Sequence, residues 1–175
     1  MQSSATESIE QVAMEKVSSA AKEGKYLTFE LSGEEYGLEI LKVKEIIGIM
    51  NITSVPQTPP YVKGVINLRG KVIPVIDLRL KFSMAYLEYN ERTCIIVVDM
   101  INKSGMKVVM GIVVDSVSEV LNIKREEIED TPTFGFSLNT DCILGMAKVK
   151  GSVKILLDID KVLTLDSDIT EKMMH

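Results

Sequence analysis

The chain has 175 residues, 46% of them apolar, and its 20 basic and 25 acidic residues give a net charge of −5. Val and Ile occur 19 times each, which favours strands and excludes a disordered chain. The acidic balance argues against nucleic-acid binding, and no apolar run reaches the roughly 18–20 residues of a membrane span. We therefore expect a soluble cytoplasmic protein with no nucleic-acid partner and no direct membrane insertion.

The elements expected along the chain are short strands after a different N-terminal segment. Residues 1–24 are rich in Ser, Ala and Glu and predict a flexible or loosely helical extension, with a partner-binding helix as the alternative. Glycine-containing turns then separate short apolar runs, as in hairpins. The predicted strands are 26–31, 35–40, 43–51, 64–68, 71–78, 93–101, 106–113, 117–121, 143–149 and 152–157. Ten short strands without intervening helices predict an all-β protein of barrels or sandwiches, with short terminal helices possible.

An internal repeat organises these strands. Residues 36–47 resemble residues 110–121 with an offset of 74, and residues 64–78 resemble residues 145–159 with an offset of 81. A longer loop at 130–141 accounts for the difference of seven residues. Five strands per repeat predict two related β-lobes that share an interface, because each is too small to bury a sufficient core alone. The lobes would occupy residues 25–165, and residues 166–175 form a C-terminal tail.

The sequence offers few groups for catalysis. The one histidine is the terminal residue, His175, and no cysteine or histidine spacing suits zinc. Cys94 and Cys142 lie in apolar runs and are expected to be small buried thiols. We therefore predict no enzyme activity, no cofactor and no metal. One alternative is hydrolysis by carboxylates, but each candidate follows apolar strand residues and is expected to cap a strand end or face solvent: Asp77, Asp99, Asp115 and Asp158.

Arg69 is the residue that most suggests binding. It lies between Leu68 and Gly70 at a predicted hairpin tip, where its side chain points outward from a rigid support. A guanidinium there offers five donors and a flat stacking surface, which is why arginine is enriched at interface hot spots. The alternative is a solvated turn residue paired with a carboxylate.

The segment around Arg69 resembles the central motif of the CheW family, the adaptors of bacterial chemotaxis. The resemblance rests on Thr58-Pro-Pro-Tyr-Val-Lys-Gly-Val-Ile-Asn-Leu-Arg-Gly-Lys-Val-Ile-Pro-Val-Ile-Asp-Leu-Arg79. It extends to residues 35–46 upstream and 111–121 downstream, and so covers about 25–163. It implies two five-stranded SH3-like barrels, in agreement with the repeat.

The resemblance also implies a function and a set of interface residues. Such a protein is a non-enzymatic coupler that binds the regulatory domain of the histidine kinase CheA and the cytoplasmic tip of methyl-accepting chemotaxis receptors. It would be recruited from the cytoplasm to membrane receptor arrays. Arg69 and Glu45 would form a charged pair at the control surface, and Val43, Gly64 and Val120 would belong to or support that surface. The alternative is an adaptor of a chemosensory system unrelated to motility.

Overall fold

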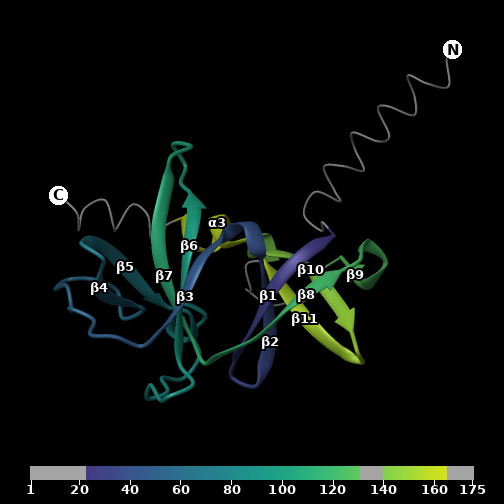
Figure 1. The fold of residues 1–175 in the computed structure, drawn as a ribbon, viewed down its shortest axis with the longest axis horizontal. Coiled ribbons are helices and arrows are strands. Elements are labelled where there is room, and N and C mark those ends of the chain that lie inside the picture. The colour runs from purple at the N-terminus through teal and green to yellow at the C-terminus, as the bar shows by residue number, and fades with distance from the viewer. Residues whose placement is uncertain (1–22, 131–139, 165–175) are drawn as a thin grey trace, which may run out of the picture.

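In the computed structural model of this protein, the described residues, 23–130 and 140–164, form two curled sheets with short helical turns (Figure 1). The strands are β1 (Gly24–Leu31), β2 (Glu34–Glu39), β3 (Val43–Gly48), β4 (Val62–Leu68), β5 (Lys71–Asp77), β6 (Cys94–Ile101), β7 (Lys107–Val114), β8 (Ser116–Ile123), β9 (Ile128–Glu129), β10 (Ile143–Val149) and β11 (Ser152–Leu157). The α-helices are α2 (Leu78–Lys81) and α3 (Ile159–Val162), and the 3-10 helices are η1 (Ile40–Lys42), η2 (Arg125–Glu127) and η3 (Thr140–Cys142).

The strand order shows two barrels that exchange strands. The five-stranded barrel has the order β3-β6-β7-β5-β4, and the six-stranded barrel has the order β8-β1-β2-β11-β10-β9. The first two strands of each repeat therefore join the later strands of the other repeat. The exchange places β2 parallel to β11 and β5 parallel to β7.

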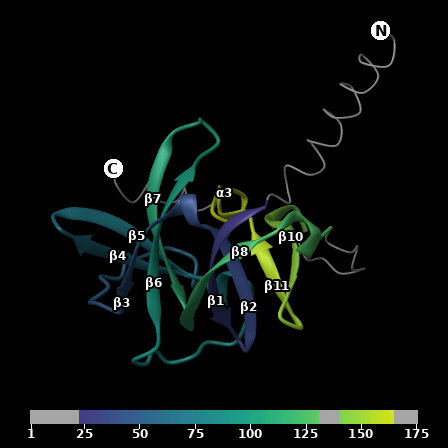
Figure 2. The same ribbon diagram turned by 45° about the vertical axis from the view of Figure 1, so that its right-hand side comes forward.

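The largest apolar cluster lies between the barrels. Leu27, Phe29 and Leu38 contribute to it from the six-stranded barrel, and Ile96 and Ile112 from the five-stranded barrel. Figure 2 shows the same two bodies side by side after a rotation of 45°. Each barrel also has a small interior cluster of its own. Because small barrels bury little surface alone, the shared cluster makes them one folding unit.

The expectation of two small barrels related by a repeat is confirmed, with a correction to how the repeat maps onto them. Each predicted lobe was a single repeat, whereas each observed barrel contains strands of both repeats. The local pattern of apolar residues determines strands but carries no information about which distant strand becomes the neighbour. The six-stranded barrel also gains β9, a two-residue strand too short to leave a pattern.

Residues 1–22 and 165–175 lie outside the described residues, so nearly all of the expected flexible or loosely helical N-terminal extension and the whole C-terminal tail fall there. The described helices, α2 and α3, instead follow the last strand of each repeat, where Asp77 and Asp158 accept hydrogen bonds from the backbone N–H of Leu80 and Lys161. Among the described residues, no helix has the length and apolar character needed to cross a membrane.

Tyr26 links the stability of this fold to pH. It is 1% exposed, and burial, together with the charge of Glu39, raises its pKa from 10.0 to about 12. The unfolded phenol ionises near pH 10 while the folded one keeps its proton, so stability present below pH 10 is lost as the pH rises toward 12. Between pH 9 and 11, the free energy of unfolding measured by urea denaturation should fall by about 1 kcal/mol more in the wild type than in Tyr26→Phe. Equal losses in the two proteins would contradict this assignment.

Candidate protein-binding site

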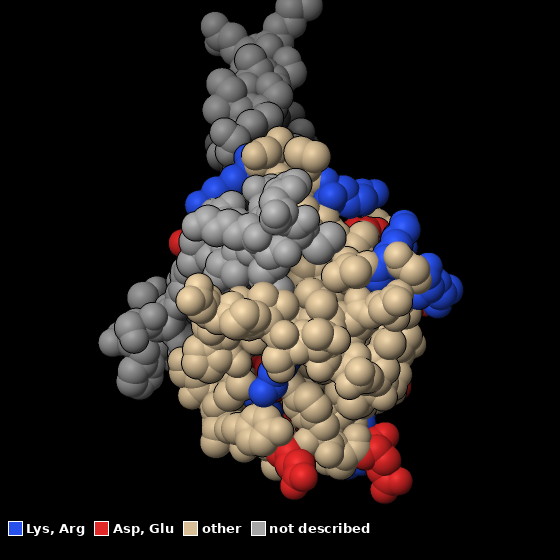
Figure 3. Space-filling view, turned by 90° about the vertical axis from the view of Figure 1, so that its left-hand side faces the viewer, with Lys and Arg blue, Asp and Glu red and all other residues tan. Residues whose placement is uncertain are grey.

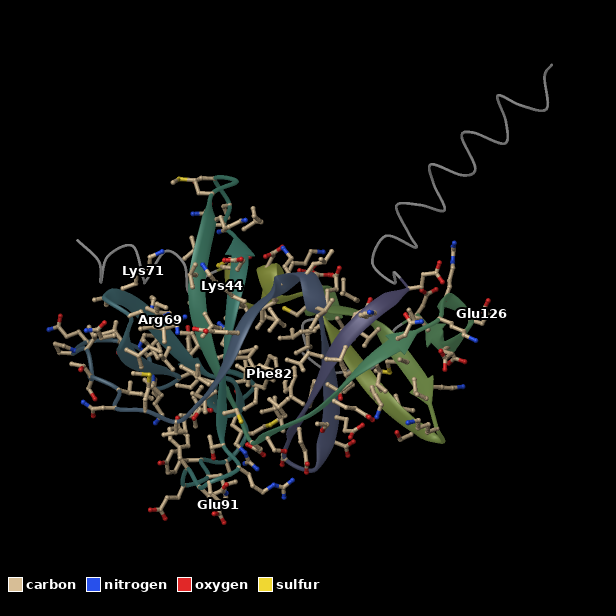
Figure 4. All side chains as sticks on the ribbon, viewed as in Figure 1. Lys44, Arg69, Lys71, Phe82, Glu91 and Glu126 are labelled. Atoms are coloured by element: carbon tan, nitrogen blue, oxygen red, sulfur yellow. The ribbon has the colours of Figure 1, made fainter. Side chains whose placement is uncertain are left out.

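Arg69 lies at the tip of the hairpin that joins β4 and β5. Its φ is 52° and that of Gly70 is 86°, so both central residues of the turn are left-handed, as in a type I′ hairpin. The backbone N–H of Gly70 donates to Oδ1 of Asn67 at 2.9 Å and fixes the turn from within. The Arg69 side chain is therefore presented from a rigid support, as Figure 4 shows on the left of the molecule.

The structure brings Arg69 and Glu45 together. Nη2 of Arg69 donates to Oε1 of Glu45 on β3 at 2.5 Å, and the two side chains are 72% and 28% exposed. β3 and β4 are the two edge strands of the five-stranded sheet, so the ion pair joins its opposite edges. Nearby, backbone hydrogen bonds between Thr53 and Val65 hold the segment after β3 against the edge strand β4. The pair thus lies where the barrel closes.

Two exposed apolar side chains neighbour this ion pair along the chain. Ile46 follows Glu45 on β3, on the other face of the strand, and is 43% exposed. Val72 lies just past the turn on β5 and is 49% exposed. Figure 3 shows that this end of the molecule carries few charged side chains over a broad area. Apolar surface with a few placed charges is typical of protein-binding sites, where the charges set register and the apolar area contributes affinity.

Gly64 contributes to this barrel from the inside. It is buried on β4 with a φ of 137°, next to a β-bulge in its pairing with β5. A Cβ at this position would lie 1.9 Å from the carbonyl oxygen of Thr53. Any effect of Gly64 on a binding surface therefore acts through the position of the Thr53 segment.

The two valines of the expected interface belong to different barrels. Val43 begins β3 and packs, partly buried, against the cluster between the barrels. Val120 lies on β8 of the six-stranded barrel, opposite Leu27, and is 50% exposed. A surface that includes both residues must span the two barrels.

The repeat places a second set of such residues on the six-stranded barrel, and of these only Val120 was expected from the sequence. Lys150 is 81 residues after Arg69, and its φ of 53° is nearly the same. Val153 corresponds in the same way to Val72 and is 47% exposed, and Val120 corresponds to Ile46 with the offset of 74. The offsets were visible in the sequence, but exposure was not, because it depends on the strand exchange.

Three of the four carboxylates considered for hydrolysis accept hydrogen bonds within the fold. Asp77 caps α2 and also accepts a hydrogen bond from the Tyr89 hydroxyl at 2.7 Å. Burial of the phenol is the larger cause, and this hydrogen bond the second, of a raised pKa for Tyr89. Asp115 and Asp158 likewise accept hydrogen bonds, whereas Asp99 has one buried oxygen without a partner among the described residues. The expectation of strand-end caps or solvated groups therefore misses Asp99.

Cys94 and Cys142 are free thiols, and both are partly exposed rather than buried as expected. Burial raises the pKa of the Cys142 thiol, which disfavours the reactive thiolate. No group of three or more Cys, His, Asp or Glu residues within 23–130 and 140–164 has the geometry to hold a metal ion.

Comparisons with known proteins agree on one family. A family model described as CheW-like domain matches residues 25–167. The chain is 44% identical over 139 residues to the chemotaxis protein CheW of Klebsiella aerogenes, covering 79% of this chain and 81% of that one. It is 34% identical over 144 residues to CheW of Bacillus subtilis, covering 82% and 88%. The crystal structure of scaffolding protein TtCheW from Thermoanaerobacter tengcongensis is similar with a TM-score of 0.72 and 34% identity, covering 81% of this chain and 93% of that one.

Proposed function

Because this chain belongs to the CheW family, we propose that it is a non-enzymatic coupling protein that links chemoreceptors to the histidine kinase CheA. The observation that carries the proposal is the similarity to chemotaxis CheW proteins, which spans the entire two-barrel unit. In this role the protein acts in the cytoplasm and is recruited to receptor arrays at the membrane.

The geometry of the candidate site supports a binding role. A coupler needs shaped apolar surface and a few fixed charges. The five-stranded barrel offers exposed Ile46 and Val72 and the fixed Arg69–Glu45 pair. The residues of the expected interface also lie on both barrels, so a partner or pair of partners can contact the whole unit. We propose that the tip of the receptor and the regulatory domain of CheA are those partners.

The direct test is a reconstitution of receptor-containing membranes and CheA with and without this protein. We expect the protein to sediment with the membranes and to raise CheA autophosphorylation, because coupling needs a bridge between the two components. Adding receptor ligand should then lower or change that activity. The measurements are sedimentation of each component and incorporation of labelled phosphate.

Two omissions serve as controls. CheA with this protein but no receptor, and CheA with receptor but no adaptor, should both stay near the basal rate. If the complete mixture also stays at the basal rate, with folded components, the proposed function is wrong.

A further inference from the structure

The chain passes between the two barrels at two places in the described structure. Between β2 and β3 it crosses through η1, and between β7 and β8 it crosses at the single residue Asp115. The crossovers lie at opposite ends of the cluster between the barrels, the first near α3 at the top of Figure 1 and the second at the bottom. Each crossover carries a charged side chain that pairs with a residue of a short helix, α2 or α3.

At the second crossover, the carboxylate of Asp115 joins the two barrels. Its Oδ1 accepts from Nε of Arg79, which follows β5 in the five-stranded barrel, at 2.7 Å. Its Oδ2 accepts from the backbone N–H of Ser32, in the β1–β2 turn of the six-stranded barrel, at 2.8 Å. The Arg79 and Asp115 side chains are only 14% and 19% exposed, so solvent screens this pair little.

At the first crossover, the carboxylate of Asp160 does the same. Asp160 lies on α3, after the last strand of the six-stranded barrel. Its Oδ2 accepts from Nζ of Lys42 in η1 at 2.7 Å, and its Oδ1 accepts from the backbone N–H of Ile101, at the end of β6 in the five-stranded barrel, at 2.8 Å. Both oxygens are thus used, one for a cation and one for a backbone donor.

The repeat relates the two bridges and reverses their charges. Arg79 and Asp160 are 81 residues apart and occupy the same helical turn of each repeat, while Lys42 lies one position from the counterpart of Asp115 at the offset of 74. One bridge therefore has its cation on the helix and its anion on the crossover, and the other has the opposite arrangement. Both keep a carboxylate between two donors despite the reversal, so the shared feature is the carboxylate that joins the two barrels.

The two bridges supply directional contacts between the two barrels. Apolar burial in the cluster between the barrels holds them together but is non-directional. Charge-assisted hydrogen bonds depend on angle and distance. Two of them at opposite ends of the cluster restrict rotation of one barrel against the other.

We propose that Asp115 and Asp160 are positioning residues that fix the angle between the barrels and thereby align the binding residues on both. The proposal rests on the proposed function for its consequence in coupling, since Val43, Glu45 and Arg69 lie on one barrel and Val120 on the other. The structural half of the proposal, that the two residues fix the angle between the barrels, concerns the isolated protein alone.

The structural half is tested by the distance between spin labels on the two barrels. Labels are attached at Lys71→Cys and Asn122→Cys, both exposed, after Cys94 and Cys142 are replaced by serine. We expect a narrow distance distribution in the parent and a broader or shifted one with Asp115→Asn. An unchanged distribution would overturn the proposal.

Three further variants sharpen the measurement. Asp115→Glu keeps the charge but moves it by one methylene, so a role in positioning predicts a shifted distance between the labels. A distance equal to that of the parent would show that charge alone matters and would overturn the proposal. Asp160→Asn tests the other bridge if an Asp115 variant does not fold. Glu129→Gln breaks the exposed Lys148–Glu129 pair within one barrel and should leave the distance unchanged.

The functional half is tested with unlabelled proteins in the reconstitution described above. For Asp115→Asn we expect CheA activation to fall by about fivefold or more, the low end of typical coupling between sites, while Glu129→Gln behaves as wild type. Full activation by a variant whose label distance has changed would overturn the positioning role and leave the proposed function intact. Failure of the wild type to activate CheA would instead overturn the proposed function, and the label distances would still decide the structural half.

Discussion

Gly64→Ala is expected to lower the free energy of unfolding by roughly 4 kcal/mol or more, a loss large enough to threaten folding. The new Cβ would meet the carbonyl oxygen of Thr53 at 1.9 Å and its carbonyl carbon at 2.7 Å. These are backbone atoms held by paired hydrogen bonds between Thr53 and Val65, so they cannot move aside as the end of a flexible side chain would. The φ of 137° adds strain for any residue with a Cβ. Urea denaturation measures the loss.

Gly48→Ala is the matched control for this change. Gly48 lies at the end of β3 in the same barrel, and a Cβ there would meet no atom within 4 Å. We expect a change of less than about 1 kcal/mol, of either sign. A Gly64→Ala protein as stable as Gly48→Ala would show that the Thr53 segment yields, and that Gly64 does not hold the barrel edge.

This result bears on how Gly64 relates to the interface. The resemblance implies that Gly64 belongs to or supports the binding surface, and the structure places it under the Thr53 segment, in the interior. A binding defect from a change at Gly64 would therefore follow from a disturbed barrel. A defect from a change at an exposed residue would instead follow from a lost contact.

Much of the fold was predictable from local signals. The type I′ turns at Arg69-Gly70 and Lys150-Gly151 follow from glycine and the flanking apolar runs, and both have the expected positive φ values. The strand exchange was not predictable, because the repeat tells which strands are alike but not which are neighbours. The end of β3 at Gly48 was also missed, since Ile49 and Met50 continue the apolar run past it.

The site was predictable where residues act through sequence neighbours and not where they act across the fold. The outward position of Arg69 follows from its hairpin, whereas its pairing with Glu45 came only from the resemblance. The bridges made by Asp115 and Asp160 join segments 36 and 118 residues apart. Their partners become neighbours only through the crossovers, so no local pattern could reveal them.

Arg69→Glu is expected to abolish most of the activation of CheA while the protein stays folded. Arginine contacts at interface hot spots contribute about 2 kcal/mol or more, so reversing the charge should weaken partner binding roughly 30-fold or more. The stability cost is small, because an ion pair with one side chain 72% exposed contributes about 1 kcal/mol or less. Kinase activity in the reconstitution, titrated against adaptor concentration, and urea denaturation measure the two effects separately.

Lys148→Glu is the matched control, since it makes the same change of charge beside a carboxylate. Lys148 pairs with Glu129 at 2.8 Å, and the two side chains are 63% and 59% exposed on the six-stranded barrel. It should lose as little stability as Arg69→Glu and keep normal activation.

The double variant Glu45→Arg with Arg69→Glu distinguishes the role of the ion pair in stability from its role in binding. It restores an attractive contact between β3 and the hairpin, but it presents the opposite charges to a partner. We expect it to regain stability without regaining activation. If Arg69→Glu alone activates CheA normally, Arg69 lies outside the interface, and the assignment of Ile46 and Val72 to the binding surface is wrong as well.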